Sequence, residues 1–217
     1  MPATPRPSPP RRTPVQARSR ARVDAILDAA DAVFLEMGFA AATTNHVAAR
    51  AGTSIGSLYR FFPDKEAILV ALAERYGERM RAIAVTVSPP DPRGQTLAGL
   101  VGNGIDRFNA YLVASPGIRT LIEQAGHPAL RAGRQAHESA MATLIRASQA
   151  RVAGGMPAAE LDAVVEVTQV VLGALQVLSV SRDATFRALV VEEAKRMVTT
   201  YLARRLGVAE DAPLGGQ

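Results

Sequence analysis

The chain has 217 residues, of which 48% are apolar, enough for one substantial core or for a small domain beside a larger one. It contains no cysteine, which excludes disulfides, thiolate metal sites and cysteine redox chemistry. The formal net charge is +5, and because residues 1–22 hold six arginines and no acidic residue, the excess positive charge lies there. No apolar run is long enough to span a membrane and no export signal is recognisable, so we expect a soluble, cytoplasmic protein.

The first part of the chain is rich in proline and arginine. Residues 1–17 therefore predict a disordered tail, although a basic arm of this kind also suits contact with DNA phosphates or the minor groove. Arg18, Arg20 and Arg22 adjoin the first expected helix and are candidate DNA contacts, with a solvated helix end as the alternative. We expect a second disordered tail over residues 211–217.

Four helices are expected before the first proline-rich loop. Apolar residues recur at helical spacing in the first of them, and Gly38 ends it. Thr43 and Ser54 are the expected N-caps of two short helices, and Gly52 between them provides a left-handed turn. The expected helices cover residues 18–37, 44–51, 55–61 and 64–84.

A Gly-x-Ser-x-Gly pattern runs from Gly52 to Gly56 and resembles the nucleophile elbow of serine hydrolases. An elbow needs a strand before the glycine turn, whereas the residues before Gly52 are alanine-rich and helical in spacing. No histidine stands where a catalytic triad would need its base. We therefore expect no catalytic residues and no enzymatic activity.

Two short helices joined by a tight glycine turn are typical of a helix-turn-helix, whose second helix enters the major groove of DNA. Four features occur here in order: Thr-Thr at 43–44, Ala-Gly-Thr-Ser at 51–54, Leu-Tyr-Arg-Phe-Phe at 58–62 and Lys-Glu at 65–66. Residues 18–70 thereby resemble the DNA-binding domain of the tetracycline-repressor (TetR) family. The resemblance implies a homodimeric transcription regulator, most often a repressor, whose C-terminal helices form the dimer interface and a ligand pocket.

The resemblance also implies roles for single residues. Residues at the turn and at the start of the recognition helix fall where base edges are read. Thr43, Tyr59 and Lys65 match phosphate contacts, with a half-buried hydroxyl for Tyr59 and a solvated amine for Lys65 as alternatives. Arg60 faces either phosphate or solvent. Phe61 replaces the polar residue often found at its position, which leaves a phosphate contact there in doubt. The candidate DNA contacts besides the three arginines above are Thr43, Thr44, Thr53, Ser54, Ile55, Gly56, Ser57, Tyr59, Arg60 and Lys65.

Helical patterns also fill the rest of the chain, which predicts an all-α fold of about nine helices. The last two are apolar around most of their surface, so we expect them to pair with their copies in a second chain as a four-helix bundle, with a buried pair inside one chain as the alternative. The further helices are expected at 95–113, 116–125, 128–152, 158–181 and 184–206. The candidate dimer contacts are Val164, Val171, Leu175, Leu178, Val190, Met197 and Tyr201.

A pocket is expected among the helices between residues 97 and 180, lined mostly by apolar side chains. Arg119, Glu123 and His127 share a helical face and suit an anion or a metal, although a solvated ion-paired face explains them better. We therefore expect no metal and no cofactor. The candidate ligand contacts are Asn103, Arg107, Tyr111, Arg119, Glu123 and Gln124.

The resemblance thus implies a dimeric repressor that binds a palindromic operator and is released by a small molecule, which the apolar helices lead us to expect to be largely apolar. The alternatives are a helical small-molecule-binding protein and a sequence-indifferent DNA-binding protein with a degenerate helix-turn-helix. We expect a helix-turn-helix domain over 18–66 with its motif at 42–61, a connecting helix over 67–84, and an effector-binding and dimerisation domain over 85–210.

Overall fold

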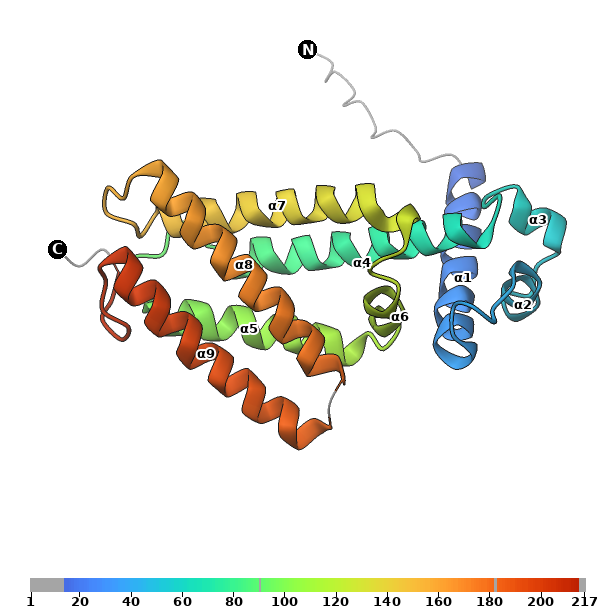
Figure 1. The fold of residues 1–217 in the computed structure, drawn as a ribbon. Helices are drawn as coiled ribbons and strands as arrows, with labels where there is room; N and C mark the ends of the chain where they lie inside the picture. The colour runs from blue at the N-terminus through green and yellow to red at the C-terminus, as the bar shows by residue number, and fades with distance from the viewer. Residues whose placement is uncertain (1–13, 90, 182, 215–217) are drawn as a thin grey trace, which may run out of the picture. The chain divides into compact units, whose positions relative to one another are not determined.

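The computed structural model describes residues 14–89, 91–181 and 183–214. These residues form nine α-helices, one turn of 3-10 helix and no strand beyond an isolated bridge between Thr96 and Pro213, which confirms the all-α fold (Figure 1). The chain divides between Ile68 and Leu69 into two compact units, the N-terminal and the C-terminal unit. The helices are α1 (Pro14–Met37), α2 (Thr44–Arg50), α3 (Ile55–Tyr59), α4 (Lys65–Val87), α5 (Leu97–Ala114), α6 (Ile118–Glu123), α7 (Arg131–Ala150), α8 (Ala158–Ser181) and α9 (Ala184–Leu206), with the 3-10 turn at Pro128–Leu130.

The N-terminal unit has a small core in which helices α1, α2 and α3 meet. Ile26 and Phe34 of α1 are buried against Val47 of α2 and Leu58 of α3, each with no more than 1% of its surface exposed. The Phe34 ring meets that of Phe39 edge to face at 5.1 Å between ring centroids. Neither short helix is long enough to be stable alone. Each therefore depends on the one or two apolar side chains that it buries in this core.

The two short helices are delimited by the predicted signals. The Thr43 hydroxyl caps α2 by accepting from the amide of His46, and the Ser54 hydroxyl caps α3 by accepting from the amide of Ser57, both at 3.2 Å. Gly52, between them, has φ +60°, a left-handed conformation that glycine adopts without strain. Thr43, Gly52 and Ser54 thus predict the turn between α2 and α3, and the structure confirms it.

Lys65, in the first turn of α4, makes three hydrogen bonds to the turn between α1 and α2. Its Nζ donates to the carbonyl oxygens of Phe39, Ala40 and Ala42 at 2.8, 3.2 and 3.1 Å. The ammonium group also lies 4.6 Å from the centroid of the Phe39 ring, within the range of a cation–π contact. An ammonium group has three donors, and here each has a backbone acceptor.

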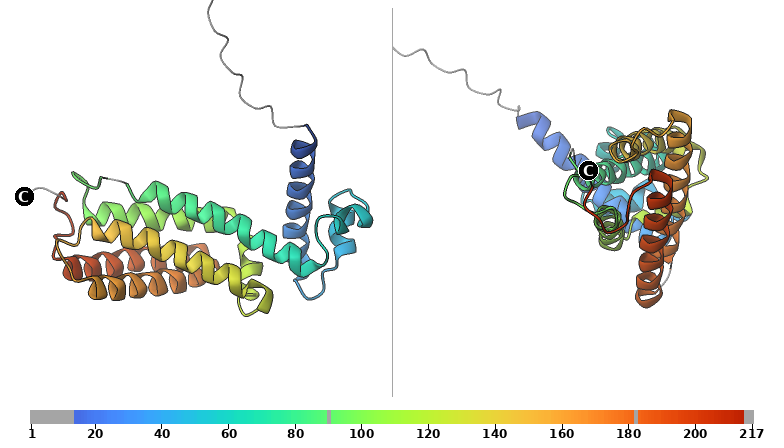
Figure 2. Two further views of the ribbon diagram at one scale, coloured as in Figure 1. Left: turned by 90° about the horizontal axis from the view of Figure 1, so that it is seen from above. Right: turned by 90° about the vertical axis from the view of Figure 1, so that its left-hand side faces the viewer.

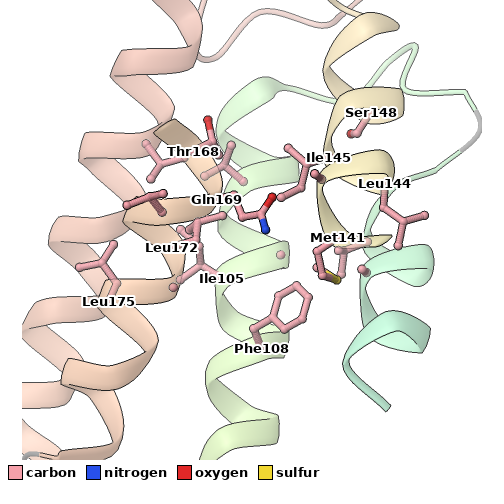
Figure 3. A pocket seen from close by; sticks show the side chains of 18 of the residues that line it. Ile105, Phe108, Met141, Leu144, Ile145, Ser148, Thr168, Gln169, Leu172 and Leu175 are labelled. Atoms are coloured by element: carbon pink, nitrogen blue, oxygen red, sulfur yellow. The ribbon is translucent and has the colours of Figure 1, made fainter. Parts of the chain in front are cut away.

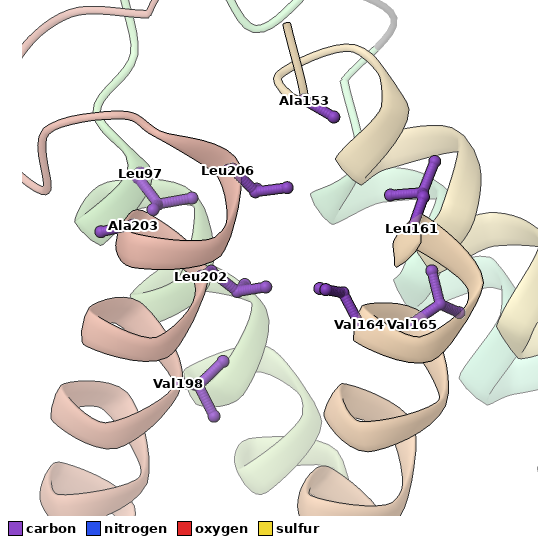
Figure 4. Packing of buried hydrophobic residues seen from close by; sticks show 9 residues of the cluster. All are labelled: Leu97, Ala153, Leu161, Val164, Val165, Val198, Leu202, Ala203 and Leu206. Atoms are coloured by element: carbon purple, nitrogen blue, oxygen red, sulfur yellow. The ribbon is translucent and has the colours of Figure 1, made fainter. Parts of the chain in front are cut away.

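In the C-terminal unit, α5 packs on α8 and α9, which lie side by side, and α7 packs on α8 (Figure 2). Side chains of α8 and α9 face each other in its core, with Leu97 of α5 beside them (Figure 4). These residues repeat at helical spacing on one side of each helix, and that side forms the core of the unit. The core cluster comprises Leu97, Ala153, Leu161, Val164, Val165, Val198, Leu202, Ala203 and Leu206.

Two segments differ from the predicted tails. Helix α1 begins at Pro14 rather than at residue 18, because proline fits the first turn of a helix, where its missing N–H costs nothing. Residues 211–214 pack on the loop before α5: Leu214 is buried and exchanges backbone hydrogen bonds with Gly94 and Gln95 at 3.1 and 2.8 Å. The remainder of both predicted tails, residues 1–13 and 215–217, lies outside the described residues.

Among the described residues, no helix is both long and apolar enough to cross a membrane.

We predict that Lys65→Met destabilises the protein by about 2 kcal/mol, because three backbone carbonyls lose a charged donor. Urea unfolding followed by far-UV circular dichroism measures the change. Arg60→Met is the matched control, since it removes a positive charge from an exposed side chain of the same unit. Equal unfolding midpoints for the two variants would contradict the role assigned to Lys65.

Candidate functional site

The start of helix α3 presents small polar groups on the surface of the N-terminal unit. Leu58 is fully buried and anchors the helix, whereas Ser54 and Gly56 are exposed and Thr53 and Ser57 are half-buried. The exposed part of the turn thus contains hydroxyl groups, with the half-buried Ile55 beside them. Hydroxyl groups at the N-terminal turn of a recognition helix are suited to contacts with base edges and phosphates.

Arg22 of α1 is brought to this turn. Its Nη1 donates to the hydroxyl oxygens of Thr53 and Ser57 at 3.3 and 3.5 Å, so this candidate DNA contact adjoins the start of α3. Arg18 and Arg20 lie on the same helix and are exposed. A positive charge beside exposed hydroxyls is the arrangement expected of a surface that approaches DNA phosphates.

The other candidate DNA contacts have partners within the unit. The hydroxyl groups of Thr44 and Tyr59 lie 3.1 Å apart and share a hydrogen bond, which holds the half-exposed Tyr59 ring beside the start of α2. The Arg60 guanidinium lies 5.5 Å from the centroid of the Phe61 ring. Lys65 has the carbonyl partners described above, so the structure gives its amine a structural role, and the predicted phosphate contact stays a prediction.

Gly56 has no structural reason to be glycine. Its φ is not left-handed, and a Cβ built there would have no atom within 4 Å. A glycine inside a helix costs roughly 1 kcal/mol relative to alanine. The fold of this chain therefore does not explain the residue.

A second feature is a cavity of about 750 Å³ inside the C-terminal unit (Figure 3). Helices α4, α5, α7, α8 and α9 line it, mostly with apolar side chains such as Ile105, Phe108 and Met141. Its volume is within the range of sites that enclose a drug-sized ligand. The cavity is therefore a candidate binding site for a small apolar molecule.

Four buried polar atoms without a hydrogen-bond partner among the described residues belong to side chains that line this cavity. They are Asn109 Oδ1, His137 Nδ1, Gln149 Oε1 and Gln169 Oε1. Buried polar atoms are nearly always hydrogen-bonded in folded proteins. Their concentration at one apolar cavity is the sign of a site that receives polar groups from a ligand or from water.

His137 packs closely on α4. Its Nδ1 lies 3.3 Å from where a Cβ of Gly77 would stand, so a side chain at Gly77 would crowd the imidazole. Burial, together with the charge of Arg81, lowers the pKa of His137 below its usual 6.5. The imidazole is therefore neutral at neutral pH.

None of the six predicted ligand contacts is among the residues that line this cavity, and their role stays a prediction. Arg119 and Glu123 form an exposed ion pair at 2.8 Å, the alternative that the sequence left open. Arg107 donates to Asn103 at 3.1 Å on an exposed face of α5. The Tyr111 hydroxyl donates to the carbonyl of Tyr76 at 3.4 Å, and Gln124 caps the end of α6.

The predicted dimer contacts differ in how far they are exposed on the surface of their own chain. Val164 is fully buried in the core of its own chain, which corrects its assignment to an intermolecular surface, and Leu175 and Val190 line the cavity. Val171 and Tyr201 pack at the edge of that core. Leu178 and Met197 are exposed, together with further apolar residues of the same two helices: Val167, Val170 and Val177 of α8, and Phe186 and Leu189 of α9.

No group of three or more histidine, aspartate or glutamate side chains able to hold a metal ion occurs in the described part of the chain.

Comparison with known proteins supports the same interpretation. Residues 26–72 match the family model for bacterial regulatory proteins of the TetR family, and residues 95–206 match the model for a tetracycline repressor-like C-terminal domain. The chain belongs to the TetR family. No protein of curated function matches the sequence.

Solved structures of TetR-family fold are similar over most of the chain. A TetR-family transcriptional regulator from Streptomyces coelicolor is 26% identical, with 85% of this chain and 99% of that chain covered and a TM-score of 0.61. A transcriptional regulator from Rhodococcus sp. RHA1 is 18% identical, with coverage of 88% and 99% and a TM-score of 0.68. The triclosan complex of SmeT is 20% identical, with coverage of 85% and 90% and a TM-score of 0.65.

We predict that this TetR-family protein becomes less stable as the pH falls below about 6.5, because the unfolded chain then binds a proton that buried His137 resists. His137→Asn should reduce the loss of unfolding free energy between pH 7.5 and pH 5.5, measured by urea titration. His46→Asn, at an exposed imidazole, is the control. An unchanged loss in the His137 variant would refute the assignment.

Proposed function

We propose that the protein is a ligand-responsive repressor that binds a palindromic operator as a homodimer and leaves it when a small molecule occupies the cavity. Each α3 would read one major groove, with the two half-sites about one helical turn, roughly 34 Å, apart. The observation that carries the proposal is the start of α3, where an unexplained glycine stands among exposed hydroxyl groups beside Arg22. The candidate DNA contacts named above would contact the bases and phosphates of the operator.

Gly56 supports contact with the groove itself and not only with phosphates. A side chain at this exposed position would meet no atom of the protein, but it would stand between α3 and a base pair. Ile55, one residue earlier, is half-buried and can meet a thymine methyl group with its exposed part. These two positions are where we expect sequence discrimination to arise.

Helix α4 supports the coupling between ligand and DNA. Its first turn holds Lys65, which is bonded to the turn before α2, and its last two turns place Met80, Ala84 and Val87 in the cavity wall. One continuous helix therefore contributes both to the N-terminal unit and to the cavity. A ligand that displaces this wall favours one position of α4, and operator DNA must then change the ligand's affinity by the same factor.

The exposed faces of α8 and α9 support the homodimer. Val167, Val170 and Val177 recur on one side of α8 with 45 to 61% of their surface exposed, and Leu189 and Met197 on α9 are 62 and 49% exposed. Apolar side chains repeated on one surface indicate a protein contact. Two copies of this pair of helices would form a four-helix bundle about a two-fold axis.

The function is tested by footprinting and titration of the full chain on the DNA upstream of its gene, at physiological salt, against random duplex. Protection of a short palindrome with about a thousandfold preference supports the proposal. Weak binding to every duplex would favour a sequence-indifferent DNA-binding protein, and no binding would favour a protein that only binds small molecules.

We predict that Gly56→Ala stabilises the protein by about 0.5–1 kcal/mol but weakens operator binding at least tenfold. The added methyl group improves the helix and obstructs the groove. Unfolding and operator titration are measured on the same preparation. Gly133→Ala is the control, because this exposed helical glycine of α7 also has open space at its Cβ position and should stabilise without affecting DNA binding. Unchanged operator affinity in the Gly56 variant would contradict the assignment.

We predict that Leu189→Arg converts the dimer to a monomer, because the new charges would meet across the two-fold axis in an apolar contact. Sedimentation at micromolar concentration measures the change. Val113→Arg on α5 is the matched control, since Val113 is also exposed, at 52%, but lies outside the proposed interface. Persistence of the dimer in the Leu189 variant would place the interface elsewhere.

A further inference from the structure

The cavity of the C-terminal unit also indicates what kind of molecule it binds, because the orientation of two glutamine amides is determined by their partners. Gln149 donates its Nε2 to the hydroxyl oxygen of Thr168 at 3.3 Å, and Thr168 in turn donates to the carbonyl of Val164 at 2.7 Å. The Thr168 proton is therefore used, and the hydroxyl can only accept from Gln149. The amide oxygen of Gln149 is left buried and without a partner.

Gln169 has the same arrangement on the opposite wall. From α8 its side chain reaches between the helices into the cavity, where Figure 3 shows its amide near Met141 and Ile145 of α7. Its Nε2 donates to the backbone carbonyl of Glu138 at 3.0 Å, which is an acceptor only. The Gln169 oxygen is thus also buried and unpartnered, as is the Asn109 oxygen on α5.

Three unpartnered oxygens on three helices are all acceptors, so they can be satisfied only by donors. The charged side chains that line the cavity are also acceptors. They are Glu138 and Glu166, and neither lysine nor arginine is among the described lining residues. Arg81 acts on His137 from α4 but does not line the cavity. A carboxylate or phosphate group would therefore meet acceptors and negative charge, with no cation to neutralise it.

We propose that the effector is an apolar molecule whose polar end donates hydrogen bonds and carries no negative charge, such as a hydrophobic amine. This inference rests on the proposed function of the cavity and adds the chemical class of its ligand. The apolar walls bind the body of the molecule, and the oxygens of Gln149, Gln169 and Asn109 accept from its polar end. Discrimination against acids arises because an anion would leave these buried acceptors unpaired.

Three probes with the same biphenyl body test the inference: 4-phenylbenzylamine, 4-phenylbenzyl alcohol and 4-phenylbenzoate. Binding to the full chain is measured by calorimetry at pH 7.5. We expect the amine to bind most tightly, the alcohol next, and the benzoate at least tenfold more weakly than the amine. Equal affinities, a preference for the benzoate, or no binding by the amine would overturn the inference.

Variants then assign the preference to the oxygens. Gln149→Leu and Gln169→Leu should each weaken amine binding by about two- to tenfold and leave the benzoate no weaker, because they remove an acceptor. Gln135→Leu is the matched control, since Gln135 lines the cavity but is exposed. If a leucine variant fails to fold, Gln169→Lys replaces it, and this variant should bind the benzoate more tightly than the amine. An unchanged ratio of amine to benzoate affinity in the leucine variants would overturn the inference.

Operator footprinting without any probe separates this inference from the proposed function. A specific footprint together with a preference for the benzoate would support the proposed repressor function and overturn only the assigned ligand class. The absence of a specific footprint would overturn the proposed repressor function. The order of the three probe affinities would still test the chemistry of the cavity.

Discussion

Lys65 holds the turn between α1 and α2 through three backbone carbonyls, and the rest of the N-terminal unit is arranged around that contact. The turn leads directly into the cap of α2, and α2 with its glycine turn determines where α3 begins. The same lysine opens α4, which continues into the C-terminal unit. A charged group that bonds to three turn carbonyls thus helps to hold the part of the N-terminal unit from which the helix proposed to read DNA projects.

The two proposed sites differ in how they treat polar groups. At the start of α3 the hydroxyl groups cap the helix or bond to Arg22, so the surface is ordered before DNA arrives. In the cavity, by contrast, amide oxygens remain unpaired, and each such buried group costs about 1–3 kcal/mol. A ligand of the proposed kind that donated to these oxygens would stabilise the state of the C-terminal unit that it binds.

Much of the fold could be predicted from the sequence, because caps and glycine turns act locally. Thr43, Gly52 and Ser54 determine the ends of α2 and α3 through contacts within four residues. The cavity could not be predicted in this way. Gln149 and Gln169 lie in helices where a glutamine is ordinarily on the surface, and the packing of α7 against α8 buries the first and half-buries the second. Arg119 and Glu123 had a clearer pattern, but a spacing of four residues indicates an ion pair as readily as a site.

The same hydrogen bonds have a consequence for chemical labelling. The chain has two lysines, Lys65 in the N-terminal unit and Lys195 in the C-terminal unit. Lys65 is held by carbonyls, and hydrogen bonds to Asp106 and Glu192 raise the pKa of Lys195. Only an uncharged amine attacks an acylating reagent, so each lysine reacts when its own hydrogen bonds open. Mass spectrometry of the two acylation rates therefore reports separately on the local contacts of one lysine in each unit, with no label introduced into the chain.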